Sequence, residues 1–425
     1  MSDSIAIVGA SLAGLRTAEQ LRAAGHTGPI TVYGAEPHPP YNRPPLSKEV
    51  LAAPAYDDAE EGPVPAMLSG LTFRRRASIE DVEFILGAEV THADLAARTL
   101  TWRDSEGSEH TAPFDALVVA TGLRPRRLSS SGPTDGRYVL RTVEDCAELR
   151  RALQPGGLDV VVIGAGFIGC ETACTLTKLG HRVTVVEPTG APMNRVLGTA
   201  LAEAIQAHHE SRGIRFVIGP GVAGFTGEDR VTGVVLDDGT TIVADLVVES
   251  VGSICNVEWL AGNGLDLSDG VLVDQHLLAV THEAPDLLPV VAVGDVARFP
   301  NALFDAVPRR VEHWSIPTDT AKRAAASLVA RLNGSPLPEA EFAPVPSFWS
   351  DQGELRFQSF GSPALADEIR IAEGELSDLL GGVLVTYLRA GAQVGSVAIN
   401  LPPARQRTMR EELLAQAPNS AGGNR

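Results

Sequence analysis

The chain has 425 residues, a length that predicts two or three domains. Hydrophobic residues make up 44% and charged residues 21%, which is typical of a globular protein, and no apolar run is long enough to span a bilayer. The formal net charge of −18 argues against binding to nucleic acid or to an anionic membrane surface. Because a strand is predicted directly after residues 1–4, we see no room for a signal peptide and expect a cytoplasmic protein.

The chain opens with a nucleotide-binding fingerprint. An apolar strand leads into the turn Gly9-Ala10-Ser11-Leu12-Ala13-Gly14, and a helix is predicted from Leu12 to near Gly25. Such a turn lets the backbone approach a pyrophosphate, which the helix N-terminus attracts. Glu36 follows the next strand, residues 30–33, where a carboxylate can accept hydrogen bonds from ribose hydroxyls. This unit predicts one bound dinucleotide.

Loops and short strands are predicted to follow this first unit. A proline-dense loop (residues 37–48) and an acidic loop (52–65) precede β-structure at 82–103 and a buried strand at 115–121. Residues 128–136 are rich in Ser, Gly, Pro and Asp, a composition that predicts a crossover between domains.

A second fingerprint occupies residues 159–187. Its turn reads Gly164-Ala165-Gly166-Phe167-Ile168-Gly169, and the following strand ends at Glu187. One such motif alone is weak evidence, but two turns, each followed by an acid, imply two nucleotides held at once. That arrangement is needed to pass a hydride from one cofactor to another.

The rest of the chain alternates predicted strands and helices. They are two hairpin-like stretches (215–225 and 231–242, the latter with an Asp238-Gly239 turn), a buried strand (245–251), a strand ending in Gly294-Asp295, a helix (318–332), further strands from 344, a helix (403–416) and a disordered tail (418–425).

Cysteines and arginine runs carry weaker signals. Four cysteines (Cys146, Cys170, Cys174 and Cys255) form no C-x-x-C pair, and we interpret Cys170 and Cys174 as packing residues. The runs at 74–76 and 309–310 are candidate basic patches for an acidic partner, or simply solvated surface. Only three lysines occur (Lys48, Lys178 and Lys322), which draws attention to Lys48 in the proline-dense loop.

As a set, further motifs resemble those of one family. They are Pro44-Pro45-Leu46-Ser47-Lys48, Ala120-Thr121-Gly122-Leu123-Arg124-Pro125-Arg126, Leu140-Arg141-Thr142-x-Glu144-Asp145, Gly166-Phe167-Ile168-Gly169-x-Glu171, Gly294-Asp295-Val296-Ala297, Val311-Glu312-His313-Trp314 and Phe348-Trp349-Ser350-Asp351-Gln352. With the two fingerprints, these resemble the FAD-dependent, NADH-using ferredoxin reductases of oxygenase and cytochrome P450 systems, the putidaredoxin reductase type.

The resemblance implies an α/β fold with two nested Rossmann-like nucleotide-binding domains, as in glutathione reductase, plus a C-terminal α+β domain. The FAD domain would comprise residues 1–117 and 245–325, the NADH domain 118–244, and the C-terminal domain 326–425. The implied activity is hydride transfer from NADH to bound FAD. Single electrons would then pass to an iron–sulfur ferredoxin that serves an aromatic-ring dioxygenase or a cytochrome P450.

The resemblance also implies individual roles. The expected FAD-binding residues are Gly9, Ser11, Ala13, Gly14, Glu36, Arg43, Lys48, Val90, Thr121, Gly122, Arg141, Gly294, Asp295 and Trp314. The expected NADH-binding residues are Gly164, Gly166, Phe167, Ile168, Gly169, Glu187, Arg195 and Gly252. No metal is expected.

Lys48 and Glu171 are expected to form an ion pair beside the flavin and the nicotinamide. The alternative is that Glu171 is an ordinary glutamate on the helix surface. Trp314 and Trp349 are candidates for the surface where the ferredoxin docks, although packing in the core is at least as good an explanation for Trp349.

Other readings share the fold. Disulfide reductases and peroxidases of this type carry a cysteine after Glu36, and residues 38–45 contain none. An NADH oxidase, or an NADH-sensing flavoprotein like apoptosis-inducing factor, remains an alternative. One departure from the family is Ile316-Pro317 in place of the usual Asn-Ala after Trp314; Pro317 is expected in the first turn of the next helix.

Overall fold

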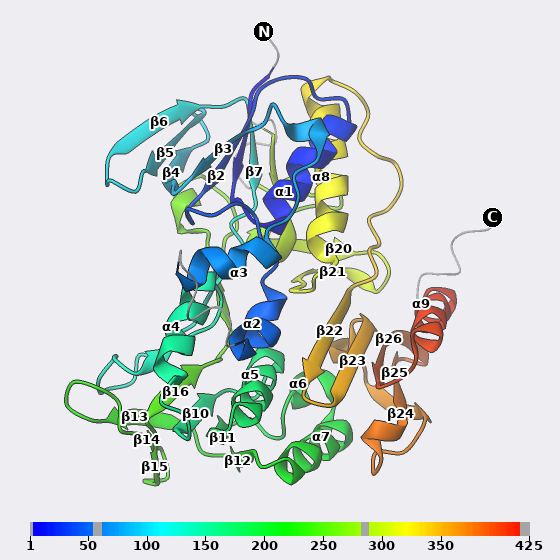
Figure 1. The fold of residues 1–425 in the computed structure, drawn as a ribbon. Coiled ribbons are helices and arrows are strands. Elements are labelled where there is room, and N and C mark those ends of the chain that lie inside the picture. Colours follow the sequence, from blue (N-terminus) through cyan, green and yellow to red (C-terminus); the bar gives the residue numbers. More distant parts are fainter. Residues whose placement is uncertain (1–2, 54–61, 282–288, 417–425) are drawn as a thin grey trace.

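Two parallel β-sheets and one antiparallel sheet organise the molecule (Figure 1). The computed structural model describes residues 3–53, 62–281 and 289–416. Most of the predicted acidic loop and the predicted disordered tail lie outside these residues. The two parallel sheets occupy the upper and lower parts of Figure 1, and the antiparallel sheet lies beside the lower one.

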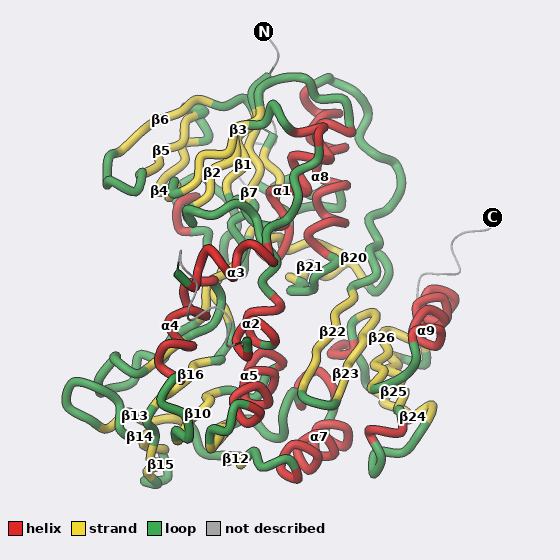
Figure 2. The backbone as a smooth tube through the Cα atoms, viewed as in Figure 1, coloured by secondary structure: helices red, strands yellow, loops and turns green. Residues whose placement is uncertain are grey.

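The first sheet is built around the first fingerprint. Its strands are parallel in the order β19 (Val290–Ala292), β7 (Ala116–Val119), β1 (Ile5–Val8), β2 (Ile30–Gly34) and β3 (Glu83–Leu86). All four residues of β1 and of β7 are buried, as expected for central strands covered on both faces. Helices α1 (Leu12–Ala23) and α8 (Ile316–Leu332) lie side by side against this sheet (Figure 2).

The second sheet repeats this order. Its strands are parallel in the order β12 (Arg215–Ile218), β11 (Arg182–Glu187), β10 (Asp159–Ile163), β16 (Leu246–Glu249) and β9 (Arg137–Tyr138). Its helices are α4 (Val143–Leu153), α5 (Phe167–Lys178), α6 (Asn194–Leu197) and α7 (Thr199–Ser211). The two fingerprints thus lie at equivalent places in two similar layers.

One strand prediction in this region is wrong. Residues 215–225 form no hairpin, because β12 pairs in parallel with β11 whereas β13 (Val222–Thr226) turns away to pair with β14 (Gly233–Leu236). The predicted hairpin at 231–242 is confirmed by the antiparallel pairing of β14 with β15 (Thr241–Val243). Residues 215–218 pair with β11, a strand that lies about 30 residues earlier in the chain, and the local sequence of 215–225 does not indicate this partner.

Three further smaller sheets accompany the two layers among the described residues. They are formed by β4 (Glu89–Asp94), β5 (Thr99–Arg103) and β6 (Glu109–Pro113); by β8 (Leu123–Pro125) and β17 (Ser253–Cys255); and by β18 (Val271–Leu272), β20 (Ala297–Asn301) and β21 (Asp305–Arg310), in which β18 runs parallel to β20.

The third large sheet is antiparallel, in the order β22 (Ser347–Gln352), β23 (Leu355–Gly361), β26 (Ala392–Ile399), β25 (Val383–Arg389) and β24 (Glu368–Glu373). Helix α9 (Pro403–Gln416), with the predicted bounds, packs on it through the buried side chains of Met409 and Leu413. The expected C-terminal α+β part is therefore present.

The hydrophobic cores explain how these layers meet. One core surrounds the first sheet, and a second joins the helices of the second sheet to the third sheet. The second core also contains Leu46, Val50 and Leu51 from the segment of η1 (Pro44–Ser47) and α2 (Glu49–Ala52), and Met67 and Leu71 of α3 (Pro63–Leu71). The proline-dense loop thus leaves the first layer and packs on the second.

The strands also bear on the predicted domain limits. Strand β7 continues to Val119 in the first sheet, past the limit at 117, and β16 lies in the second sheet, past the limit at 244. Helix α8 packs on α1 and extends across the limit at 325/326. The division into domains at those particular residues stays a prediction.

Candidate functional site

The first glycine turn brings backbone groups into close contact. Gly9 has φ +115°, and a Cβ there would overlap the Ala120 carbonyl oxygen; a Cβ at Gly14 would overlap the Gly9 carbonyl oxygen. Ser11 is the N-cap of α1, yet its side chain makes no capping bond, which leaves the hydroxyl free for another acceptor or donor. The turn therefore presents backbone and hydroxyl groups at a helix N-terminus, the geometry that suits a pyrophosphate.

The second turn has the same construction and more room. Gly164 has φ +98° and approaches the Ser250 backbone, and Gly169 approaches the Gly164 carbonyl. Apart from the residues next to it in the chain, no described residue has a heavy atom within 4 Å of the Cβ position of Gly166, the N-cap of α5. Glu187, at the end of β11, accepts hydrogen bonds from the Ala165 N–H (2.9 Å) and the Thr189 N–H (2.9 Å). The carboxylate is therefore fixed at the mouth of the turn.

Other predicted NADH-binding residues flank this turn. Phe167 packs edge-on against Phe348, with ring centroids 4.6 Å apart, whereas the Ile168 side chain is 48% exposed. Arg195 is exposed on α6, which is tied to the turn by the Met193 N–H bonding the Ala165 carbonyl at 2.9 Å. Gly252 has φ +93° and open space at its Cβ position.

A partly buried polar cluster surrounds Glu36 at the end of the first β-α-β unit. Arg43 pairs with Glu36, and the Tyr41 hydroxyl donates to the same carboxylate at 2.6 Å. Burial alone would raise the pKa of Glu36, but the positive charge of Arg43 and its hydrogen bond outweigh burial, so the pKa of Glu36 is lowered. The Nε of Arg43 is buried without a partner among the described residues. Sequence reasoning missed Tyr41, which also accepts a bond from the Val143 N–H.

Asp295 and Arg141 come together from distant parts of the chain. The Arg141 guanidinium lies 3.5 Å from the Asp295 carboxylate. Burial raises the pKa of Asp295 even though Arg141 opposes that shift. The Cβ position of Gly294 lies 2.9 Å from Ala13 Cβ and 3.9 Å from Pro317 Cγ, so the starts of α1 and α8 meet here. The predicted place of Pro317 in the first turn of α8 is confirmed.

The remaining predicted FAD-binding residues lie around these groups. The Thr121 hydroxyl donates to the Asn256 carbonyl at 2.6 Å, and Asn256 returns a bond to the Thr121 carbonyl at 3.0 Å. Gly122 has φ +60°, and its Cβ position is 3.6 Å from the Arg141 guanidinium. Val90, on β4, packs against the first core rather than beside these polar groups. Asn256 is a further residue that sequence reasoning missed.

The predicted ion pair of Lys48 with Glu171 is present. The Lys48 Nζ lies 2.7 Å from Glu171 Oε2, with only 14% and 6% of the two side chains exposed. The alternative, a surface position for Glu171, is therefore wrong. The Ser47 hydroxyl donates to Oε2 at 2.7 Å, and the Ser350 hydroxyl donates to Oε1 at 2.6 Å. Sequence reasoning missed both serines, although each stands within a motif quoted for the resemblance.

Two tryptophans form an exposed aromatic pair. Trp314 and Trp349 are 42% and 38% exposed, and their ring centroids are 5.3 Å apart in an edge-to-face arrangement. Packing of Trp349 in the core is therefore not supported. An amphipathic ring pair at a surface suits protein contact.

The cysteines are unsuited to redox chemistry. Cys146, Cys170 and Cys255 are buried, and Cys174 is partly buried. Burial raises the pKa of the Cys146 thiol and of the Cys174 thiol to about 12, so neither is a ready nucleophile. The interpretation of Cys170 and Cys174 as packing residues agrees with this burial.

Within the described ranges, no helix is long and apolar enough to cross a membrane, and no cluster of three metal-ligating side chains occurs.

Comparison with known proteins decides the family. Residues 3–321 match the pyridine nucleotide-disulphide oxidoreductase family. The chain belongs to this family. It is 35% identical over 403 residues to the ferredoxin reductase component of a chlorobenzene dioxygenase from Cupriavidus sp., covering 95% of this chain and 90% of that protein. It is 31% identical over 410 residues to putidaredoxin reductase from Pseudomonas putida, covering 94% and 89%.

Solved structures agree with these relatives. The covalent putidaredoxin reductase–putidaredoxin complex matches with a TM-score of 0.83 and 29% identity, covering 99% of this chain and 96% of that chain. A ferredoxin reductase for the CYP199A2 system of Rhodopseudomonas palustris matches with a TM-score of 0.79 and 34% identity, covering 94% and 91%. The predicted resemblance, the fold class and the classification as a flavoprotein oxidoreductase using FAD and NADH are thereby confirmed.

The residues present fit both cofactors. The first turn offers the Ser11 hydroxyl, which makes no capping bond to α1. In the loop after Glu36, the buried Arg43 Nε and Asn42 Oδ1 have no hydrogen-bond partner among the described residues, as expected for polar groups that bind a ligand. The second turn offers the open position at Gly166.

Proposed function

We propose that this protein is an NADH-dependent ferredoxin reductase that passes electrons from NADH, through bound FAD, to an iron–sulfur ferredoxin serving an oxygenase. The observation that carries the proposal is the Lys48–Glu171 ion pair, because Lys48 follows the first glycine turn in the chain and Glu171 follows the second. The pair therefore links the elements that hold the two nucleotides. A cytoplasmic location belongs to the same proposal.

Two sets of residues hold the two nucleotides. The turn at Gly9, the Glu36–Arg43 cluster and Asp295 would bind FAD, which when bound accepts a hydride and releases electrons singly. The turn at Gly164 would bind NADH. The protein contributes proximity and orientation, and the largely buried Lys48, whose side chain is 14% exposed, contributes one fixed positive charge.

Glu187 is the residue expected to select NADH. Its carboxylate is held by the Ala165 and Thr189 N–H groups at the mouth of the second turn. A carboxylate at this point accepts bonds from a ribose 2′-hydroxyl and repels a 2′-phosphate. The nearby Arg195 is exposed and would oppose that repulsion only weakly.

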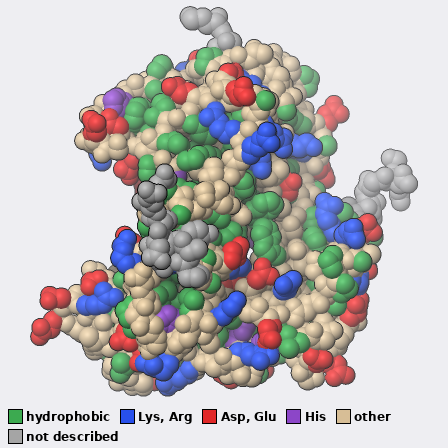
Figure 3. Space-filling model, in the orientation of Figure 1, with side chains coloured by type: hydrophobic (Ala, Val, Ile, Leu, Met, Phe, Trp, Pro, Cys, Tyr) green, Lys and Arg blue, Asp and Glu red, His purple; other side chains and the backbone are tan. Residues whose placement is uncertain are grey.

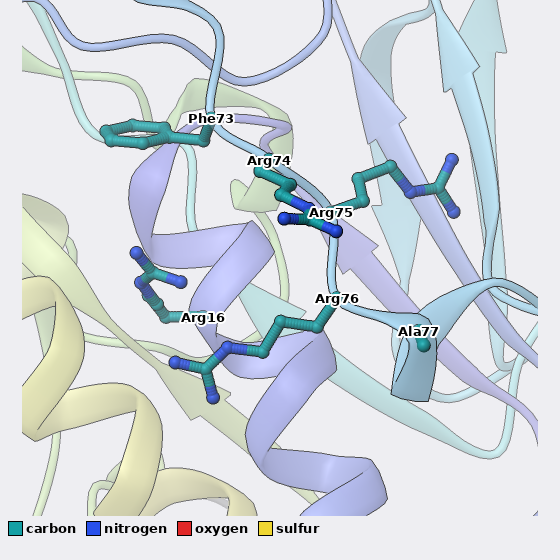
Figure 4. Close-up of a pocket in the computed structure, with 6 residues that line it drawn as sticks. All are labelled: Arg16, Phe73, Arg74, Arg75, Arg76 and Ala77. Atoms are coloured by element: carbon teal, nitrogen blue, oxygen red, sulfur yellow. The ribbon is translucent and has the colours of Figure 1, made fainter.

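A basic cleft of about 500 Å³ is the proposed docking region for an acidic ferredoxin. It is lined by Arg16, Phe73, Arg74, Arg75, Arg76 and Ala77 (Figure 4). In Figure 3, basic side chains gather over α1 and α8 on an otherwise mixed surface. A positive patch on a chain of net charge −18 gives an acidic partner a defined point of approach.

The four arginines of this cleft are not equivalent. Arg75 points away from Arg16 and Arg76 in Figure 4; it donates to the Ile79 and Val82 carbonyls and lies over the Phe84 ring, which is a structural role. Arg74 and Arg76 are exposed, and Arg76 is 3.5 Å from the buried Glu19.

The other predicted basic patch is largely neutralised. Arg309 pairs with Asp305 at 2.6 Å, and Arg310 pairs with Asp269 at 2.6 Å and with Glu312 at 2.8 Å. Less positive potential therefore remains at residues 309–310 than at 74–76, and we favour the latter for docking.

Reconstitution tests the proposal. Purified protein with FAD would be mixed with NADH, a ferredoxin of a bacterial dioxygenase system and cytochrome c as the final acceptor. We expect cytochrome c reduction that requires both NADH and the ferredoxin. Turnover with oxygen or ferricyanide but none with any of several iron–sulfur ferredoxins would show that the protein is an NADH oxidase or a sensor instead.

A further inference from the structure

The buried carboxylate of Glu171 is held from a third direction, by the antiparallel sheet. Ser350 lies on β22, and its hydroxyl donates to Glu171 Oε1 at 2.6 Å across a sequence separation of 179 residues. Ser47 and Lys48 bind the other oxygen, Oε2, at 2.7 Å each. Ser350 is fully buried, and Glu171 is 5% exposed, so water cannot replace the lost donor easily.

Ser350 is itself positioned by a chain of buried polar groups. The Gln352 amide Nε2 donates to the Ser350 hydroxyl oxygen at 3.2 Å, and Gln352 Oε1 contacts His209 Nε2 at 2.9 Å. Burial lowers the pKa of His209 to about 4, so its ring is neutral at pH 7. An amide oxygen only accepts, which assigns the ring proton of His209 to Nε2.

Every bond in this chain then points the same way. Nδ1 of His209 is left as the acceptor that faces the Cys174 thiol, with Sγ 3.7 Å away. Each residue donates a hydrogen bond to the next: Cys174 to His209, His209 to Gln352, Gln352 to Ser350, and Ser350 to Glu171. A chain of this direction must end on a group that only accepts, and an ionised carboxylate is such a group.

We propose that Ser350, oriented by Gln352, is a positioning residue that fixes the Glu171 carboxylate and, through it, the Lys48 ammonium at the cofactor site. The third sheet thereby contributes to hydride transfer through the position of Lys48. This inference rests on the proposed function for its catalytic consequence, but the positioning of Lys48 can be measured independently of any reaction.

The chain provides a matched control for Ser350. Ser359 lies on the neighbouring strand β23, is also fully buried, and its hydroxyl has no hydrogen-bond partner among the described residues. Ser350→Ala and Ser359→Ala each remove one buried hydroxyl from the same sheet. Only Ser350→Ala removes a donor to Glu171. An effect seen in both variants would therefore reflect general damage to the sheet, and an effect seen only in Ser350→Ala would reflect the lost hydrogen bond.

The first measurement is chemical labelling of lysines in the FAD-loaded protein, read by mass spectrometry. The chain has only Lys48, Lys178 and Lys322, and the last two are exposed internal standards. We expect Lys48 in Ser350→Ala to react several-fold faster than in the parent protein, relative to the standards. Ser359→Ala should match the parent, and Ser350→Thr, which keeps the hydroxyl, should restore slow labelling.

The second measurement is the rate at which NADH bleaches the bound flavin under anaerobic conditions. For Ser350→Ala we expect a rate about tenfold lower at saturating NADH, the factor that one hydrogen bond to a charged group corresponds to. The half-saturating NADH concentration should be unchanged, because the Ser350 side chain is fully buried and its hydroxyl is bonded to Glu171. Gln352→Met should slow the rate by a smaller factor in the same direction, and it serves as the test if Ser350→Ala folds poorly.

Two outcomes separate the inference from the proposed function. If Lys48 labelling and flavin bleaching in both Ser350→Ala and Gln352→Met equal those of Ser359→Ala, the positioning role is refuted. If the parent protein reduces no ferredoxin but the labelling difference persists, the positioning role stands and the proposed function fails.

Discussion

At the scale of single residues, the site depends on three carboxylates with limited exposure: Glu171 is buried, and Glu36 and Asp295 are partly buried. Glu36, Glu171 and Asp295 all carry a basic partner, supplied by Arg43, Lys48 and Arg141 respectively. A buried charge that loses its partner is strongly unfavourable, so each pair constrains both of its members.

Replacement of Lys48 tests one such pair. We expect Lys48→Met to leave Glu171 charged and unpaired, lowering the free energy of unfolding by about 3–5 kcal/mol and slowing flavin reduction by NADH. The double variant Lys48→Met with Glu171→Gln should recover most of the stability but not the rate. Urea unfolding and stopped-flow absorbance measure the two effects; a double variant no more stable than the single one would contradict the ion pair.

Glu187→Arg tests nucleotide selection. Loss of a hydrogen bond to a charged group costs about 1.5–3 kcal/mol, so the ratio of kcat/KM for NADH over NADPH should fall at least ten- to hundredfold. Glu187→Gln is the matched control: it removes the charge at similar shape, and it should weaken discrimination without reversing it. An unchanged ratio in Glu187→Arg would remove Glu187 from the NADH site.

At the scale of elements, helices α1 and α8 support the basic cleft and the tryptophan pair. Their starts meet at Gly294, with Arg16 one turn into α1 and Trp314 two residues before the first residue of α8. Charged groups at the rim of an interface act mainly on the rate of association.

Charge reversal of Arg74 and Arg76 to Glu should lower kcat/KM for the ferredoxin about tenfold at low ionic strength, with less effect at high salt because the charges are screened. Reduction of ferricyanide should be unaffected. The matched control is reversal of Arg309 and Arg310, whose charges are already paired; it should have the smaller effect. Equal losses with both acceptors would contradict docking at either patch.

Two histidines, His209 (buried) and His313 (partly buried), make the free energy of unfolding depend on pH. Burial lowers the pKa of His209, on α7, and of His313, before α8, to about 4 from 6.5. Between these values the unfolded chain binds more protons than the folded one, so stability is complete above about pH 6.5 and is lost as the pH falls toward 4.

In the parent protein, each of these histidines should lower the free energy of unfolding by a few kcal/mol as the pH falls from about 6.5 to 4. In His313→Gln this decline should be smaller, because one of the two histidines is absent. His92→Gln, at an exposed position on β4, is the control and should leave the slope unchanged. Chemical denaturation at several pH values gives the slope. A slope identical in parent and His313→Gln would show that His313 is not buried in its neutral form.

Sequence predicted the elements that carry strong local signals. Both glycine turns, α9 with its bounds, and Pro317 in the first turn of α8 follow from residues close together in the chain. The hairpin at 215–225 was wrong because a neighbouring parallel strand, absent from the local pattern, takes residues 215–218.

At the scale of the whole molecule, the proline-dense segment, helix α5 of the second layer and strand β22 of the third sheet meet around one small set of polar groups. The segment of Lys48 packs on the second sheet through Leu46, Val50 and Leu51, and the third sheet contributes Ser350 from the far end of the chain. Sequence reasoning found Lys48 and Glu171 through the resemblance. It missed Ser47, Ser350 and Tyr41, since contacts across such separations leave no periodic pattern to detect.

An anaerobic titration tests the central claim most directly, that FAD bound at the first turn takes a hydride from NADH at the second and yields electrons to a protein acceptor. We expect one equivalent of NADH per chain to bleach the flavin, and two equivalents of oxidised ferredoxin to restore its colour without oxygen. A flavin that NADH does not bleach, or one whose colour returns only when air is admitted, would contradict the claim.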